Sequence, residues 1–272
     1  MNILVHSFLY SKAYFCGSQI NRKKIVMNIL VCISKAPDTT SKITFKDGDT
    51  KFNEDGVQFI VNPYDEWYAL VRALELKEAN GGKVTIISVG TADYEPIMRK
   101  ALAIGADEAF RVDSEASDAY QVAAEIANYI SSNSFDLVLT GKETINYNGS
   151  QVGGMIAAII DSPYASHATK LEVNGSTAMV ERDKQGGVEV LELTLPAVIS
   201  AAKGMAEQRI PNMRGIMAAR SKPLTVVPAS VTETLTETIK FSLPPAKGDV
   251  KLVDPENMTE LINLLHNEAK AI

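Results

Sequence analysis

Short apolar segments alternate with segments of helical periodicity between residues 27 and 160, and this order constrains the fold more than any other feature of the chain. Buried strands are predicted at four short apolar runs: 28–33 (NILVCI), 84–89 (VTIISV), 109–112 and 136–140. Helices are predicted at the segments that follow: 65–79, 94–104, 119–130 and 152–160. Strands joined by helices of this length run parallel, and the helices then cover both faces of the sheet. The sequence therefore predicts an α/β fold built on a parallel sheet.

The pattern changes beyond residue 163. Residues 170–193 alternate polar and apolar positions around two glycine-containing turns, at Asn174-Gly175 and Gly186-Gly187. This pattern predicts an added antiparallel hairpin region. The apolar run at 196–202 is suited to return the chain to the sheet.

The two ends of the chain differ from its centre. MNILV occurs at 1–5 and again at 27–31, where it continues into a strand, so we expect residues 1–26 to be a disordered extension or a misassigned start. Prolines punctuate the tail, and a terminal helix is predicted at 256–269. We therefore expect an α/β domain over 27–222 and an extended C-terminal arm over 223–272.

The composition excludes several classes of protein. The net charge of −6 argues against a nucleic-acid-binding surface, which is normally basic. No apolar run approaches the roughly 18 residues of a membrane span, so no membrane insertion is expected. Two cysteines, Cys16 and Cys32, provide no disulfide framework and favour a reducing compartment. We expect the cytoplasm, or the mitochondrial matrix if the source is eukaryotic.

A polar loop lies between the predicted strand at 136–140 and the helix that follows it. Its glycine, asparagine and serine residues lead into a helix start whose free N–H groups suit a small anion. The loop matches neither the Walker A motif nor the dinucleotide fingerprint nor the serine elbow. Three scattered histidines give no metal-ligand spacing. The residues leave two interpretations open: a binding loop without a catalyst, or a plain strand–helix loop in which Ser150 caps the helix.

Two further segments carry possible function. Asn62-Pro63 precedes a helix with acids at its start, and this start, the end of the 28–33 strand and the polar loop are suited to meet at one sheet edge. Residues 200–220 show no clean period and mix methionines with arginines. Such a segment fits either core packing or an adaptable partner surface.

The ordered segments resemble one family, the beta subunit of electron transfer flavoprotein. The resemblance runs from NILVCISKAPDTTSKI through NPYDEWYAL, GGKVTIISVG, ALAIGADEA, DLVLTGKETI, QVGGMIA and VERDKQGGVEVLEL to LPAVISA and GIMAARSKP. It covers nearly all of residues 27–223. The family implies an adenine-nucleotide-binding, Rossmann-like sheet in an electron carrier rather than an enzyme with its own substrate turnover.

The resemblance also implies the ligands and their positions. The family's beta subunit holds a structural AMP, and its alpha subunit holds most of the FAD site. The implied cofactor-binding residues are Cys32, Asn62, Pro63, Tyr64, Asp65, Val89, Gly141, Lys142, Glu143, Thr144, Ile145, Asn146, Tyr147, Asn148, Gly149, Ser150, Gln151 and Val152. The family usually has an acid where this chain has Asn146, so the nucleotide contacts are expected to differ.

Partners follow from the same resemblance. It implies a heterodimer with the alpha subunit, which takes electrons from acyl-CoA dehydrogenases of fatty acid beta-oxidation and passes them to a quinone oxidoreductase. The implied partner-binding residues are Arg209, Ile210, Pro211, Asn212, Met213, Arg214 and Gly215, with Met213 as the apolar anchor. The alternatives are a bifurcating beta subunit with a second FAD in place of AMP, a nucleotide-hydrolysing or ligase enzyme on a similar sheet, and a monomeric nucleotide sensor.

Overall fold

The structure is a computed structural model that describes residues 26–231 and 233–272. Apart from Val26, the extension expected at 1–26 lies outside the described residues. The chain divides into two compact units. The first runs up to Lys42 and continues from Glu54 to Glu237, and the second combines Ile43–Asn53 with Thr238–Ile272.

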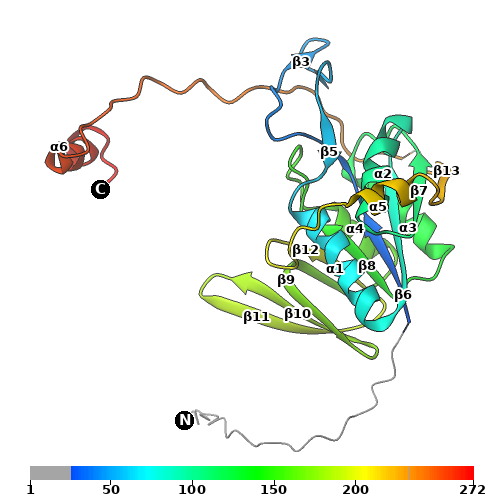
Figure 1. Cartoon of the computed structure of the whole chain (residues 1–272). Coiled ribbons are helices and arrows are strands. Elements are labelled where there is room, and N and C mark those ends of the chain that lie inside the picture. Colours follow the sequence, from blue (N-terminus) through cyan, green and yellow to red (C-terminus); the bar gives the residue numbers. More distant parts are fainter. Residues whose placement is uncertain (1–25, 232) are drawn as a thin grey trace, which may run out of the picture. The chain divides into compact units, whose positions relative to one another are not determined.

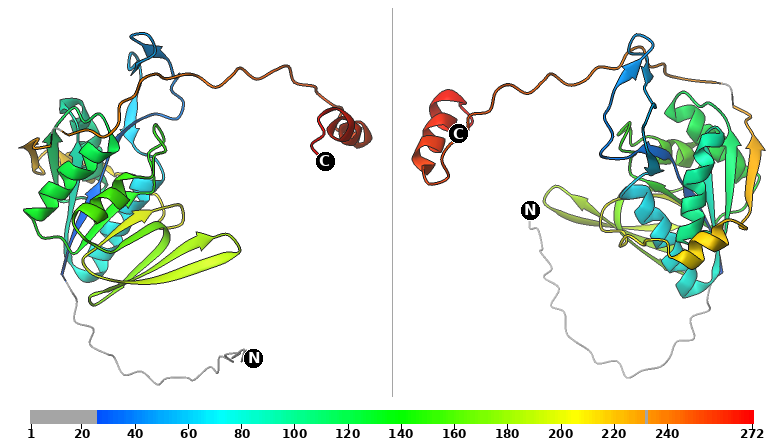
Figure 2. Two further views of the ribbon diagram at one scale, coloured as in Figure 1. Left: turned by 180° about the vertical axis from the view of Figure 1, so that it is seen from behind. Right: turned by 45° about the horizontal axis from the view of Figure 1, so that its top comes forward.

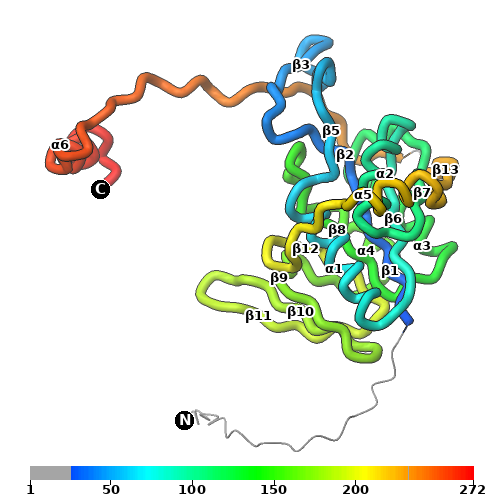
Figure 3. The backbone as a smooth tube through the Cα atoms, in the orientation of Figure 1, coloured from blue at the N-terminus to red at the C-terminus, as the bar shows by residue number. Residues whose placement is uncertain are grey.

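A nine-stranded sheet forms the first unit, in the order β11-β10-β9-β12-β8-β1-β6-β7-β13 (Figure 1). Its strands are β1 Met27–Cys32, β6 Gly82–Val89, β7 Glu108–Asp113, β8 Leu137–Gly141, β9 Tyr164–Asn174, β10 Thr177–Lys184, β11 Gly187–Thr194, β12 Ala197–Ala201 and β13 Leu224–Pro228. Every neighbouring pair from β9 across to β13 is parallel. The pairs β9–β10 and β10–β11 are antiparallel. Figure 3 shows the path of the backbone through these strands. The predicted α/β fold with added hairpins is confirmed.

Helices cover both faces of the sheet (Figures 1 and 2). One core lies under α1 (Asp65–Asn80) and α2 (Glu95–Ile104), and the other lies under α3 (Ala119–Ser131) and α4 (Val152–Ile159). The central strand supplies both cores, because Ile29 and Val31 face the first and Leu30 and Cys32 face the second. A strand that is apolar on both faces is typical of a buried parallel sheet.

The chain between β1 and α1 forms a second, smaller pairing within the first unit. Strand β2 (Lys35–Pro37) pairs antiparallel with β5 (Phe59–Val61) and so brings the chain back to Asn62 beside the end of β1. The ammonium group of the buried Lys35 fixes this pair, since it lies 3.8 Å from the Phe59 ring centroid and forms ion pairs with Glu54 and Asp93.

The second unit joins a short hairpin to the tail of the chain. Strands β3 (Phe45–Lys46) and β4 (Lys51–Phe52) pair antiparallel, and the Phe45 ring stacks on Phe241 with centroids 5.1 Å apart. The tail ends in α6 (Met258–Asn263), which widens into a π-type turn over Leu264–Glu268. No helix of residues 26–231 and 233–272 is long and apolar enough to cross a membrane.

Two segments differ from the sequence expectation. A short helix, α5 (Met213–Ala219), forms where no helical period was recognised, because the Asn212 side chain accepts a hydrogen bond from Gly215 N and so caps its first turn. Strand β13 was not predicted either, and it pairs with β7 from Leu224 to Pro228.

Candidate functional site

Three strands end side by side where the order of the sheet reverses. From β1 the chain passes through α1 to β6 on one side, and it later returns through α3 to β8 on the other side of β1. The expected binding residues Cys32, Val89 and Gly141 are the last residues of β1, β6 and β8. Open α/β sheets bind ligands at this position, the carboxyl edge at a topological switch point.

Asn62 joins two segments that are 81 residues apart in the sequence. Its side-chain amide donates a hydrogen bond to the Glu143 carbonyl at 3.0 Å, and its amide oxygen accepts one from Ile145 N at 3.0 Å. The Asn62 side chain is fully buried, so both bonds are shielded from water. The structure thus confirms that Asn62 and the polar loop meet at one edge of the sheet, and it gives Asn62 the role of holding the loop.

The start of α1 packs directly on the ends of β1 and β8. The Glu66 carboxylate accepts hydrogen bonds from Ser34 N at 2.8 Å and Ser34 Oγ at 2.7 Å. Gly141 allows the contact with β8, since a Cβ at this position would lie 2.8 Å from Glu66 Cγ and 3.2 Å from Asp65 Cβ. Two buried acids, Asp65 and Glu66, therefore already occupy the positive end of α1.

The start of α4 carries no such compensation. Its first turn contains no acidic residue, and no side chain caps it. Gln151 is the N-cap residue, so the interpretation of a plain strand–helix loop is wrong in naming Ser150 as the cap. Ser150 has a left-handed backbone (φ 51°), and its hydroxyl lies 3.4 Å from a carboxylate oxygen of Glu143 instead. The first turn of α4 therefore presents its N–H groups to this edge without a competing acid or side-chain cap.

Gly153 brings α4 close to the strand below it. A Cβ at this position would lie 2.7 Å from Thr140 Oγ1 and 3.3 Å from the Tyr164 hydroxyl. Among the described residues, Thr140 Oγ1 is the one buried side-chain polar atom without a hydrogen-bond partner. The Tyr164 hydroxyl lies 3.2 Å from Ser200 Oγ on the neighbouring strand. A layer of hydroxyl groups thus lies directly beneath the start of α4.

The rest of the polar loop is open to solvent. Residues 146–151 are all exposed, and the Tyr147 side chain is 72% exposed. Asn148 N donates to the Thr144 carbonyl at 2.8 Å, which closes the loop into a turn with Asn148 in the left-handed region (φ 49°). Tyr64, at the start of α1, is also half exposed and left-handed (φ 69°). Strained backbone of this kind concentrates at binding sites.

Charged groups balance one another beside the loop. Lys142 and Glu143 form an ion pair at 2.9 Å, which raises the pKa of Lys142 and lowers that of Glu143. Burial raises the pKa of Asp65, and the nearby Lys142 acts in the opposite direction. Burial raises the pKa of the Cys32 thiol strongly, with a further contribution from Glu66, so Cys32 presents a neutral thiol to the site. No group of three or more candidate metal ligands occurs among the described residues.

Glu66 is expected to make stability depend on pH. Burial raises its pKa from 4.5 to about 7, although hydrogen bonds from Ser34 act in the opposite direction. The folded state therefore holds a proton that the unfolded state releases above pH 4.5, and stability falls as pH rises from 4.5 to about 7. Across this window we expect the free energy of unfolding of the wild type to fall by an amount on the order of a few kcal/mol. Glu66→Gln should not show this fall, because its side chain does not titrate. Urea unfolding of both proteins at pH 5, 6, 7 and 8 measures it, and parallel curves would contradict this assignment.

Gly141→Ala is expected to displace the start of α1 from β8. The added methyl group would press on both the Glu66 side chain and its backbone nitrogen, at 2.8 and 3.1 Å, and overpacking of this kind costs about 1–3 kcal/mol. Gly149→Ala, eight residues further along the same loop, is the matched control because nothing lies within 4 Å of its Cβ. Thermal unfolding of the two variants should separate them, and equal midpoints would show that the contact yields without cost.

The expected partner-binding segment is held to α1 through Arg209. Arg209 forms a two-point ion pair with Glu78 of α1 at 2.5 and 3.1 Å, and Trp67 Nε1 donates to its carbonyl at 3.2 Å. The segment is thus held to the outer face of α1. Ile210 is 83% exposed and Met213 is 73% exposed. The structure therefore presents the apolar side chains of Ile210 and Met213 to solvent.

Sequence reasoning missed Ser34, Glu66 and Thr140 as parts of the site. Glu66 was assigned only to the helix end, yet its carboxylate reaches the end of β1. Ser34 lies two residues beyond the end of β1, and Thr140 is the penultimate residue of β8. A polar residue at the end of an otherwise apolar strand is the signal that identifies such positions.

The fold defines an open, doubly wound α/β protein, with the candidate site at its switch point. Residues 49–232 match the family model described as electron transfer flavoprotein domain. The chain is 37% identical to the electron transfer flavoprotein subunit beta of Bacillus subtilis, over 90% of this chain and 100% of that protein. It is 35% identical to the subunit of the same name from Sus scrofa, over 75% and 82% of the two chains. It is also 31% identical to caffeyl-CoA reductase-Etf complex subunit CarD of Acetobacterium woodii, over 90% and 98%.

The chain therefore belongs to the electron transfer flavoprotein family, as a beta subunit. The family consists of electron carriers, and a beta subunit pairs with an alpha subunit.

Proposed function

We propose that this beta subunit binds AMP as a structural nucleotide at the carboxyl edge of its sheet. The observation that carries the proposal is the start of α4, which combines a first turn without acids with an open polar loop at the switch point. A phosphate suits the N–H groups of that turn. Asn146, Asn148 and Gln151 offer amide groups for ribose hydroxyls and an adenine edge.

In this proposal the residues of the beta subunit bind the nucleotide and fix its position. Asn62 and Gly141 set the shape of the loop, and the neutral Cys32 thiol and Val89 provide an apolar floor. FAD, held mainly by the alpha subunit, supplies the redox chemistry of the heterodimer. The nucleotide at this edge takes no part in electron transfer.

We further propose that the heterodimer takes electrons from acyl-CoA dehydrogenases and delivers them to a quinone oxidoreductase. The exposed apolar side chains of the segment Arg209 to Gly215 support a docking role, since Arg209 ties the start of this segment to α1 and Met213 begins α5, which packs on α2. Burying one such side chain in a partner's pocket stabilises a complex by roughly 1.5–3 kcal/mol. A reducing compartment, the cytoplasm or the mitochondrial matrix, suits this role.

A second candidate is a bifurcating beta subunit that binds FAD in place of AMP. The openness of residues 146–151 favours it, because the described chain does not close over the site and leaves room for a larger dinucleotide. The aromatic side chains of Tyr64 and Tyr147 are both exposed and are suited to stack on planar rings.

Nucleotide analysis of the purified heterodimer tests these candidates. The complex is denatured, and the released nucleotides are identified by chromatography and mass. We expect one AMP and one FAD per heterodimer. Two FAD and no AMP would replace the first candidate by the second. A heterodimer that releases no adenine nucleotide besides one FAD would remove the proposed site at α4.

A further inference from the structure

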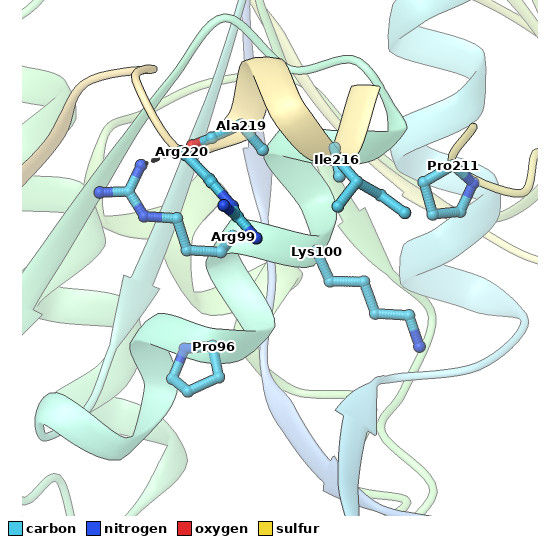
Figure 4. Close-up of a pocket in the computed structure, with 8 residues that line it drawn as sticks. Pro96, Arg99, Lys100, Pro211, Ile216, Ala219 and Arg220 are labelled. Carbon is cyan, nitrogen blue, oxygen red and sulfur yellow. Dashed lines mark hydrogen bonds between the residues drawn. The ribbon is translucent and has the colours of Figure 1, made fainter. Parts of the chain in front are cut away.

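A hollow between α2 and α5 combines an apolar lining with basic side chains (Figure 4). It encloses about 630 Å³ and opens to solvent. Three cations line it: Arg99 and Lys100 from α2, and Arg220 from the end of α5. Both helices, and the residues before α5, also supply the apolar lining: Pro96, Ala103, Pro211, Ile216 and Ala219.

The two helices are locked together, so the hollow exists before anything binds. Arg99 donates hydrogen bonds to the carbonyls of Ala219 at 2.8 Å and Lys222 at 2.7 Å. Lys222 in turn donates to the carbonyl of Leu102 at 2.9 Å, near the end of α2. Each helix end is thus held by a cation from the other segment, which also suits the negative ends of the helix dipoles. A preformed site loses little conformational entropy on binding.

The charge of the hollow points to an anionic occupant. The whole chain carries a net charge of −6, yet three cations meet here. Figure 4 draws Arg99 and Lys100 on α2 and Arg220, the residue that follows α5. Lys100 lies with its ammonium group 5.3 Å from the Trp67 ring centroid. These cations would attract a carboxylate at the mouth of the hollow, across an apolar lining that weakens solvent screening.

The hollow continues into the exposed apolar segment. Ile216 lines the hollow, while Met213 and Met217, spaced four residues apart on α5, remain exposed. Pro211 lines the hollow, and its neighbour Ile210 projects into solvent. A ligand that covered only the cations would leave these side chains in water. A protein surface with an acidic side chain beside apolar ones covers both.

We propose that the α2–α5 hollow receives an acidic side chain of the electron-donating dehydrogenase, next to the apolar contact made by Met213. The inference rests on the proposed function, because that function supplies the partner. It adds a polar half to the docking surface, carried by Lys100 and Arg220. Charges at the rim of an interface mainly speed association and make it depend on salt.

The test is electron transfer from an acyl-CoA dehydrogenase of the same organism to the purified heterodimer, as a function of NaCl. We expect Arg220→Glu to raise the KM for the heterodimer roughly tenfold at low salt and to flatten its salt dependence, with kcat unchanged. Lys100→Glu tests the same rim from α2 and should act alike. Arg220→Lys should stay within about twofold of the wild type, because it keeps the charge. The exposed Lys42→Glu is the matched control, with the same charge change elsewhere and an expected KM like that of the wild type.

Each outcome decides the proposal. Bound nucleotide and melting temperature are measured for every variant, so that misfolding is recognised separately from weakened docking. Unchanged KM in both Arg220→Glu and Lys100→Glu, with normal transfer by the wild type, would overturn the docking role of the hollow alone. A wild-type heterodimer that accepts no electrons from any acyl-CoA dehydrogenase would overturn the proposed function and this inference with it. The heterodimer could also self-associate, with Arg220→Glu abolishing this association while electron transfer stays unchanged. The hollow would then bind a second copy of the protein, and the proposal would be overturned.

Discussion

Gly215→Ala is expected to detach α5 from α2 and to lower the free energy of unfolding by about 1–3 kcal/mol. A Cβ at Gly215 would overlap the carbonyl oxygen of Ala103, a backbone atom that cannot rotate away. The gain in helix propensity, up to about 1 kcal/mol, offsets only part of this cost. Loss of the docked α5 should also weaken the apolar docking surface, so electron transfer from a dehydrogenase should fall together with stability. Urea unfolding and limited proteolysis of the segment around α5 measure the two effects.

Gly154→Ala on α4 is the matched control for this substitution. It also places a methyl group on a helical glycine, but the nearest atom, in the Tyr164 ring, lies 3.5 Å away at an ordinary contact distance. We expect its stability to equal or exceed that of the wild type. If Gly215→Ala unfolds at the same urea concentration as the wild type, α5 does not need its close approach to α2.

Asn62→Ala is expected to release the polar loop and to lower the free energy of unfolding by about 2–4 kcal/mol. The substitution removes both hydrogen bonds that hold the loop and leaves Glu143 O and Ile145 N without these partners. It also empties a fully buried position. Because the loop precedes the start of α4, retention of nucleotide by the purified heterodimer should fall as well. Urea unfolding and nucleotide analysis measure the two effects.

Two further variants test whether the effect of Asn62→Ala comes from its two buried hydrogen bonds. Asn62→Asp keeps the acceptor for Ile145 N but points a buried carboxylate oxygen at Glu143 O, so its stability at neutral pH should fall at least as far as that of Asn62→Ala and should recover when acid protonates the carboxylate. Asn133→Ala removes a single exposed hydrogen bond, from Asn133 Nδ2 to the Tyr129 carbonyl at 2.8 Å, and should change stability by no more than about 0.5 kcal/mol. If the Asn62→Ala heterodimer retains its nucleotide, contacts other than those of Asn62 hold the loop in shape.

The main strands and helices were predictable because their apolar residues follow a strong local period. The helix predicted at 65–79 is α1 at Asp65–Asn80, and the strand predicted at 84–89 is β6 at Gly82–Val89. Local signals failed for α5, a helix of seven residues stabilised by the Asn212 cap and by docking on α2. Helices this short depend on tertiary contacts more than on propensity.

The candidate site was predictable in its position and not in its contacts. A parallel sheet dictates that the ends of β1 and β8 meet at one edge, so the convergence of Asn62 with the polar loop could be expected from chain order. The sequence does not state which side chains point inward. Glu66 was therefore assigned to helix capping, whereas the structure turns it toward Ser34 and the end of β1.

The sequence by itself determined the α/β class, the parallel sheet with added hairpins, and the family, because periodicity and ordered motifs are properties of local segments. The tertiary structure alone decided that Asn62 holds the loop, that Glu66 turns toward Ser34, and that α2 and α5 enclose a basic hollow. Each of these features depends on distances between residues far apart in the chain. Such distances are fixed only when helices and strands pack against one another.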